Sequence, residues 1–141
     1  MTMKTIVGVV VGTIYLVGAA AACGGARDAG KFREVQRVHA GTLDVVLLSA
    51  DAALHHGKDA VSVEFRSATG GGLVDVGTVK GSAAMSMAGT PMMSGVEVER
   101  TSVPGRYEAA TDFSMAGTWR TTIEWTGPAG RGSVTFSIAV Q

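Results

Sequence analysis

Hydrophobic and polar residues alternate along most of the chain after residue 31, as expected for strands that bury one face. The clearest example is the segment 119–125, where Trp119 and Trp125 fall on one face and Arg120 on the other. Similar patterns predict strands over residues 32–38, 61–65, 74–84, 95–101, 107–111, 119–125 and 134–140, and the apolar run at 43–48 predicts a strand that is buried on both faces or bulged. We therefore expect a protein built mainly from short strands.

Glycine and proline mark the connections between these predicted strands. Turn residues occur at 69–72, 104–105 and 127–130, and residues 50–59 form a polar loop. After residue 31, no segment has the hydrophobic period of a helix as long as ten residues. Short strands with turns about every 8–12 residues are typical of an immunoglobulin-like fold. We predict an all-β domain over residues 32–141, an immunoglobulin-like β-sandwich of about seven strands.

The N-terminus has the pattern of a bacterial secretion signal. Lys4 precedes an apolar run over residues 6–17, which is shorter than the roughly 20 residues that a membrane-spanning helix needs. Four alanines then lead to Cys23, the only cysteine, in a pattern that resembles a lipobox, where the cysteine is acylated. We expect a signal peptide over residues 1–22, and a lipidated cysteine with a tether over residues 23–31. Simple secretion and an uncleaved anchor are the alternatives.

Charge and residue types exclude several classes of function. Once Lys4 is removed with the signal, 11 basic side chains remain against 12 acidic ones. Such a near-neutral chain lacks the basic face that nucleic acids require, and only the lipid at Cys23 would attach it to a membrane. No nucleophile stands at a recognisable spacing from a histidine and an acid. We therefore expect no enzymatic activity.

Methionines form the cluster with the most specific chemistry. Four lie within residues 85–93, and a fifth lies further along the chain, before a tryptophan. Thioether sulfur is soft and uncharged, and the metal ion that it suits best is Cu(I). Residues two apart in a strand share a face, and Gly89 and Pro91 favour a reversal that returns a later methionine to the earlier pair. The predicted Cu(I) ligands are Met85, Met87, Met92 or Met93, and Met115.

Two other roles fit the methionines and stay open at this point. Methionine fills irregular gaps in hydrophobic cores, and packing is the favoured role for Met115 taken alone. An exposed group of methionines would instead form an apolar surface that docks a partner. Trp119 would shield a bound ion through its ring face or, as is more usual for a strand tryptophan, belong to the core.

Histidines provide secondary candidates for metal ligands. His55 and His56 lie in the predicted polar loop, where both imidazoles can point outward. Imidazole suits Cu(II) and Zn(II), although an exposed pair without a metal is the more common arrangement. His39 stands alone near a strand end, and we expect it at the surface.

Several short motifs occur in a fixed order between residues 43 and 140. After an apolar strand come Gly57-Lys-Asp-Ala-Val-Ser-Val63, Met85-Ser-Met87, Val103-Pro-Gly-Arg-Tyr107 and Phe113-Ser-Met-Ala-Gly-Thr-Trp119. This order resembles the YtkA-like/FixH-like domains of bacterial envelope proteins. Met115, Ala116, Gly117 and Trp119 match the usual form of the last motif in that family. The departures are Ser86 and Ser114, where the family often has proline, and Asp59, where it often has asparagine.

The resemblance implies a sandwich fold, a place in the bacterial envelope, and a role in copper handling or heavy-metal efflux. Together with the methionines, it leads us to expect a Cu(I)-binding chaperone or buffer, lipid-anchored and facing the periplasm or the exterior. The alternative is a non-metal interaction module or accessory lipoprotein of an envelope transport or oxidase assembly system. A structural lipoprotein with neither role is the third hypothesis. The expected partners are a metal ion, the membrane, and an efflux or oxidase assembly protein.

Overall fold

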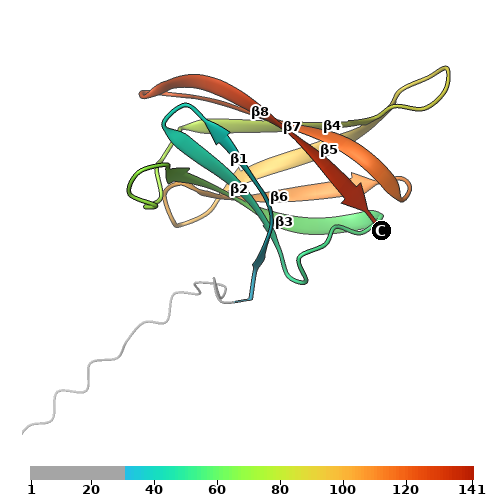
Figure 1. Ribbon diagram of the computed structural model, residues 1–141, viewed down its shortest axis with the longest axis horizontal. Helices are drawn as coiled ribbons and strands as arrows, with labels where there is room; N and C mark the ends of the chain where they lie inside the picture. The colour runs from blue at the N-terminus through green and yellow to red at the C-terminus, as the bar shows by residue number, and fades with distance from the viewer. Residues whose placement is uncertain (1–30) are drawn as a thin grey trace, which may run out of the picture.

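The structure, a computed structural model, describes residues 31–141, and these residues form eight strands and no helix (Figure 1). The strands are β1 (Arg33–Ala40), β2 (Leu43–Ser49), β3 (Gly57–Ser67), β4 (Thr78–Met85), β5 (Met92–Arg100), β6 (Arg106–Phe113), β7 (Gly117–Gly127) and β8 (Gly130–Val140). The predicted signal peptide, Cys23 and all but the last residue of the tether lie outside the described residues. Within residues 31–141, no helical segment has the length and apolarity to cross a membrane.

All eight strands belong to one antiparallel sheet, in the order β1-β2-β3-β6-β5-β4-β7-β8. The sheet curls until β1 lies near β8, so it forms a nearly closed, barrel-like structure (Figure 1). Leu54 and Val140 form a parallel bridge. Beside it, the Gln141 main-chain N–H donates to Leu54 over 2.9 Å, and the Gln141 main-chain oxygen accepts from the His56 N–H over 2.8 Å. The loop between β2 and β3 is thereby joined to the end of β8.

The all-β class is confirmed, but two separate sheets with about seven strands are not what the structure shows. Each predicted strand is present, with shifted ends. β3 begins at Gly57, inside the predicted polar loop, because it pairs with β6 as far as the partners Gly57 and Phe113. Alternation reports which face of a strand is buried, but it does not report which strands are neighbours. The pairings β3–β6 and β4–β7 make the strands one continuous sheet.

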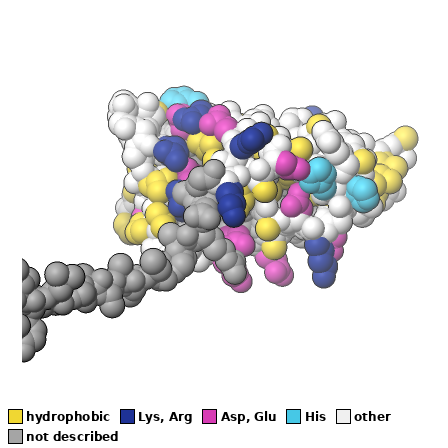
Figure 2. All heavy atoms as spheres, turned by 90° about the horizontal axis from the view of Figure 1, so that it is seen from below, with side chains coloured by type: hydrophobic (Ala, Val, Ile, Leu, Met, Phe, Trp, Pro, Cys, Tyr) yellow, Lys and Arg dark blue, Asp and Glu magenta, His cyan; other side chains and the backbone are white. Residues whose placement is uncertain are grey.

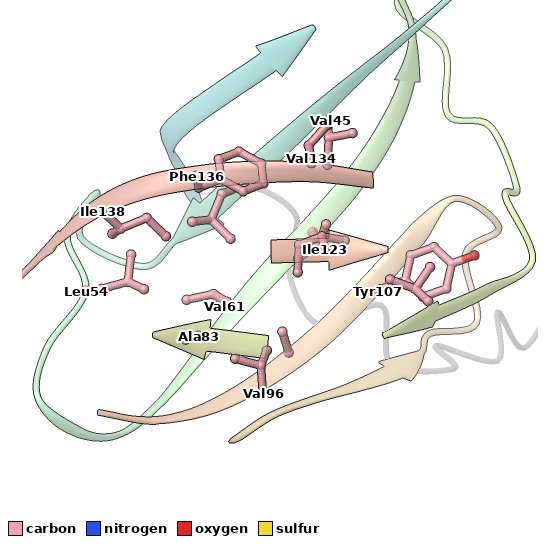
Figure 3. Packing of buried hydrophobic residues seen from close by; sticks show 14 of the residues in the cluster. Val45, Leu54, Val61, Ala83, Val96, Tyr107, Ile123, Val134, Phe136 and Ile138 are labelled. Carbon is pink, nitrogen blue, oxygen red and sulfur yellow. The ribbon is translucent and has the colours of Figure 1, made fainter. Parts of the chain in front are cut away.

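The interior is filled by side chains that alternate along the strands (Figure 3). Aromatic rings occupy both ends of this core. Phe65 packs against Tyr107 and Trp125 with centroid separations of 5.5 Å and 5.2 Å, in edge-to-face geometry. Phe113 and Trp119 form a tilted pair 5.1 Å apart, at the end of β6 and the start of β7. Such contacts add about 0.5–1.5 kcal/mol per pair beyond the area they bury.

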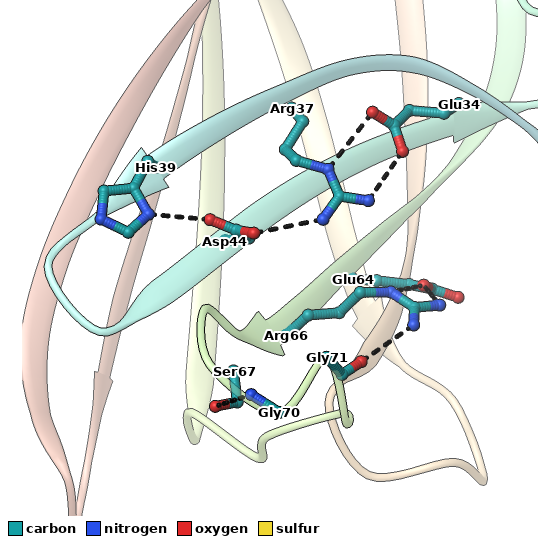
Figure 4. A network of polar contacts seen from close by, with 9 residues as sticks. All are labelled: Glu34, Arg37, His39, Asp44, Glu64, Arg66, Ser67, Gly70 and Gly71. Carbon is teal, nitrogen blue, oxygen red and sulfur yellow. Dashed lines mark hydrogen bonds and ion pairs between the residues drawn. The ribbon is translucent and has the colours of Figure 1, made fainter.

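A network of charged side chains covers the outer surface of β1, β2 and β3 (Figure 4). Glu64 is buried and accepts hydrogen bonds from Arg66 and from Arg106 Nε, the latter over 2.8 Å. Two guanidinium groups therefore compensate one buried carboxylate, as burial of a charge requires. His39 is exposed, as predicted, and its Nδ1 lies 2.9 Å from Asp44.

Candidate metal centre

The antiparallel order brings four chain segments to one end of the barrel. The loops β2–β3 and β4–β5, the turn β6–β7 and the residue after β8 all lie there, because each follows or precedes a strand end on that side. We call this the methionine end, and its residues are 50–56, 85–93, 114–117 and 141. Figure 2 shows histidine side chains next to hydrophobic ones at the right-hand end of the molecule. All the methionines and loop histidines singled out from the sequence belong to the methionine end.

Met85 and Met92 face each other across the β4–β5 hairpin. They are direct partners in the register, and directly opposed residues of an antiparallel pair point to the same face. Met85 is only 8% exposed, and Met92 is partly buried against the core. Met93 is 68% exposed, because the next residue in a strand points to the other face. Of the two alternatives open in the sequence, Met92 rather than Met93 lies alongside Met85.

The turn that carries Met115 packs against the thioether of Met85. A Cβ placed on Gly117 would lie 2.6 Å from Cε and 3.5 Å from Sδ of Met85, so the Met85 side chain rests on the main chain of that residue. Gly117 has a φ of 141°, which side chains rarely allow. The Trp119 indole N–H donates to the Met115 carbonyl over 3.1 Å and holds the turn in place. Met85, Met92 and the Met115 turn are thus brought together.

Trp119 and Met115 have opposite environments. Trp119 is fully buried, and the prediction that it belongs to the core is confirmed. Met115 is 38% exposed, so the prediction that packing is its main role is wrong. The physical reason is that Phe113 and Trp119 already fill the interior beneath the turn, which leaves the Met115 side chain at the surface.

Exposed methionines distinguish this end from the rest of the surface. Among the described residues, the large hydrophobic side chains that are exposed are Met87 at 47%, Met93 at 68% and Met115 at 38%. No leucine, isoleucine or phenylalanine of residues 31–141 is exposed in this way. The large apolar side chains exposed at the methionine end are therefore all thioethers.

The two loop histidines make different contacts. His55 Nε2 lies 2.7 Å from an Asp51 carboxylate oxygen. This hydrogen bond and the charge of Asp51 raise the pKa of His55, and the same hydrogen bond lowers the pKa of the Asp51 carboxyl. His56 Nδ1 lies 3.0 Å from the main-chain oxygen of Gln141, which can only accept. In the neutral ring, Nδ1 therefore carries the hydrogen of His56 and Nε2 keeps its lone pair.

Nitrogen and oxygen side chains alone do not form a metal site in this part of the chain. Within residues 31–141, no three side chains of histidine, cysteine, aspartate or glutamate are grouped so that they could hold a metal ion. A site with three or more side-chain ligands at the methionine end would therefore include sulfur. A set of neutral thioethers fits Cu(I) and does not fit hard ions such as Mg²⁺ or Ca²⁺.

Two contributors to this end were not found from the sequence. Gly117 was noted only as part of a motif. Its contact with Met85 arises because the β6–β7 turn passes the end of the β4–β5 hairpin, which lies between β6 and β7 in the sheet. Gln141 carries no signal in the sequence, because its role lies in a main-chain oxygen that accepts from His56.

The chain belongs to the YtkA-like family, whose model matches residues 37–124, more than half of the sequence. This confirms the YtkA-like part of the resemblance seen in the motifs; the FixH-like part is not shown. The matched region includes the β4–β5 hairpin and the Met115 turn.

Two solved structures similar to this chain are of FetP from uropathogenic Escherichia coli. A copper-bound variant of FetP is 11% identical, with a TM-score of 0.47, and the similarity covers 78% of this chain and 97% of FetP. The second structure is FetP as isolated after expression in the E. coli periplasm. It is 12% identical, with a TM-score of 0.48, and the similarity covers 79% of this chain and 99% of FetP. No curated protein matches the chain.

Proposed function

We propose that the protein binds Cu(I) in the bacterial cell envelope and acts as a copper chaperone or buffer. The ligands are Met85, Met92 and Met115, with Met87 on the adjoining loop. One observation carries the proposal: the exposed large hydrophobic residues of the described chain are all methionines. They gather at the end where Met85 and Met92 are paired across a hairpin.

The chemistry of the donor set selects the ion. Thioethers carry no charge and stay unprotonated, so they do not compensate a hard dication but accept a soft monovalent one. Met93 lies on the outer face of the same hairpin, where a second protein that delivers or accepts copper can reach it. In this proposal Met85 and Met92 hold the ion together with Met115, and the exposed thioethers exchange it.

The envelope location is part of the same proposal. It is supported by the signal-like sequence of residues 1–22 and by the lipobox-like alanines before Cys23. Membership of the YtkA-like family agrees with it. A lipid at Cys23 would tether the barrel to a membrane, beside an efflux or oxidase assembly partner that uses the metal. The protein has no enzymatic role in this proposal.

An anaerobic Cu(I) titration of the purified protein against a chromogenic Cu(I) chelator tests the ligand set. The comparison is with a variant in which Met85, Met87, Met92 and Met115 are all leucine, which keeps volume and apolarity at a stability loss usually under about 1.5 kcal/mol per site. We expect one equivalent bound by the protein and lost in the folded variant. Failure of the protein itself to compete with the chelator would reject the copper proposal.

Two single variants provide a matched control, because they differ by one position on one strand. Met92→Leu removes a thioether beside Met85, whereas Met93→Leu removes one on the outer face. We expect Cu(I) affinity to fall about tenfold or more in Met92→Leu and to change little in Met93→Leu. Because thioethers do not titrate, the affinity should be nearly constant between about pH 5 and 8. Equal losses in both variants would contradict the assignment of Met92.

Docking of a partner protein is the second candidate, and the same exposed thioethers favour it. The docking hypothesis predicts that the protein binds no copper and that a partner protein binds to the methionine end. Leucine at 87, 93 and 115 would preserve this docking, whereas serine at these positions would abolish it. Copper binding responds differently, since leucine and serine both remove the sulfur.

A further inference from the structure

We propose that His56 supplies a nitrogen ligand at the methionine end, so that the same end of the barrel also holds Cu(II). The proposal rests on the proposed function for the thioether ligands and adds a second oxidation state of the ion. It is carried by the position of His56 relative to Met115 and by the orientation of its ring.

Main-chain pairing places His56 beside the turn that carries Met115. The residue after His56, Gly57, is paired with Phe113, which ends the strand before the turn. On the other side, Gly117 after the turn is paired with Val140, and the following residue, Gln141, bonds His56. Paired Cα atoms lie about 4.5–5.5 Å apart, so the two residues that flank the Met115 turn, Phe113 and Gly117, lie next to Gly57 and Val140, which adjoin His56 and Gln141 in the chain.

The ring of His56 is held through Nδ1, which leaves Nε2 without a hydrogen in the neutral ring. The main-chain oxygen of Gln141 accepts from both the His56 main-chain N–H, over 2.8 Å, and the ring Nδ1–H, over 3.0 Å. Two bonds to one acceptor fix the ring relative to the end of β8. Histidines that bind metals commonly donate their other ring hydrogen to a main-chain oxygen in this way. Nε2, on the opposite side of the ring, is left with its lone pair.

The other described histidines are held by carboxylates instead. His55 Nε2 is engaged by Asp51. His39 Nδ1 is engaged by Asp44, and His39 lies near the end of β1, at the opposite end of the barrel from Met115. They therefore serve as controls for His56.

A nitrogen ligand changes which copper ion the methionine end accepts. Imidazole nitrogen suits Cu(II), and a thioether is a known weak, long ligand of that ion. His56 with Met115 therefore extends a Cu(I) site to Cu(II), whereas thioethers alone favour Cu(I). Binding is the whole of the proposal, and it includes no electron-transfer step.

Cu(II) titration of the purified full-length protein tests the proposal, with one equivalent of Cu(II) as the probe and electron paramagnetic resonance as the readout. The variants are His56→Asn, His55→Asn and His39→Asn. Asparagine retains an amide N–H that can replace the Nδ1–H bond to Gln141, but it lacks a counterpart of Nε2. We expect nitrogen hyperfine coupling in the protein, and its loss in His56→Asn with a fall in Cu(II) affinity of about tenfold or more.

Controls separate this proposal from the thioether site. His55→Asn and His39→Asn should bind Cu(II) as the protein does, and Met115→Leu should alter the copper hyperfine splitting. An unchanged spectrum in His56→Asn, or a loss confined to His55→Asn or His39→Asn, would overturn the assignment. The anaerobic Cu(I) titration of His56→Asn should match the protein. If the protein binds Cu(II) through His56 but no Cu(I), the thioether function fails while His56 stands as a ligand.

Discussion

Successive residues of a strand point to opposite faces, and this separates Met92 from Met93 at the methionine end. A single residue also determines how the Met85 side chain is held. Its methyl group and sulfur rest on Gly117, where a side chain would occupy the same space. Single residues therefore determine which thioethers approach one another, and a residue with no side chain is as important to the candidate site as the proposed ligands.

Gly117→Ala should destabilise the protein by about 1–3 kcal/mol, because a φ of 141° is strained for any residue with a Cβ. The new methyl group would also displace Cε of Met85, from which it would lie 2.6 Å away, and weaken Cu(I) binding. Urea unfolding and the Cu(I) titration measure the two effects. Gly95→Ala is the control, since a Cβ there meets nothing within 4 Å. Equal stability of the two variants would show that Gly117 is not required.

At the scale of the strands, pairing between β3 and β6 brings Glu64 opposite Arg106. Glu64 points away from the core that Val63 and Phe65 enter, yet it is buried, because Arg66 and Arg106 lie over it. β1 and β2 carry a second pairing of this kind on the surface, in which Arg37 bridges Glu34 and Asp44. Arg106 and Arg37 differ mainly in the burial of the carboxylates that they bind.

Arg106→Met should therefore lower the free energy of unfolding more than Arg37→Met does. Loss of Arg106 leaves the buried Glu64 carboxylate with one guanidinium partner, at about 1–3 kcal/mol. Loss of Arg37 removes exposed ion pairs, which contribute about 0–1 kcal/mol. Denaturant unfolding at neutral pH gives both values. A larger effect from Arg37→Met would contradict the importance assigned to burial.

At the scale of the whole molecule, the order of the strands gathers loops that are far apart in the chain. It brings residues 50–56, 86–91, 114–116 and 141 to one end, while the connection between β3 and β4 packs at the other. There the Tyr107 hydroxyl donates to the Gly77 carbonyl over 2.8 Å and lies 3.3 Å from an Asp75 carboxylate oxygen. Tyr107 thus links β6 to a connection 30 residues earlier in the chain.

This link should weaken at alkaline pH. Burial, with the nearby Asp75 charge, raises the pKa of Tyr107 above its usual value near 10. Below that value the hydroxyl is protonated in both states, so its stabilisation is fully present. Above it, the unfolded chain loses the proton while the folded protein keeps it, and the free energy of unfolding falls as pH rises through the folded pKa.

Tyr107→Phe should lack this part of the alkaline decline. The protein should be more stable than the variant at pH 8, by about 1 kcal/mol for the hydrogen bond to Gly77. The difference should narrow towards pH 11, measured by urea unfolding of both proteins across that range. A difference independent of pH would show that Tyr107 ionisation is not linked to folding.

The number and location of the strands were largely predictable, and so were the residues of the candidate site. Alternation located most of the strands, with the clean pattern around Trp119 and Trp125 as the strongest case, and a continuous apolar run located β2, which buries residues on both faces. The single curled sheet was not predictable, because alternation is the same whichever strands are neighbours. Met115 was misjudged because local sequence does not show that Phe113 and Trp119 fill the space beneath it.

The all-β class, the turns, and a set of soft sulfur donors in one short segment and one motif could all be read from the sequence alone. These are local properties, fixed by residue type and spacing along a single strand or turn. The folded arrangement of the strands was needed to show that Met92 faces Met85, that the Met85 side chain rests on Gly117, and that His56 adjoins the residues paired with the Met115 turn. The reason is that each of these contacts joins strands whose pairing depends on the packing of the whole sheet.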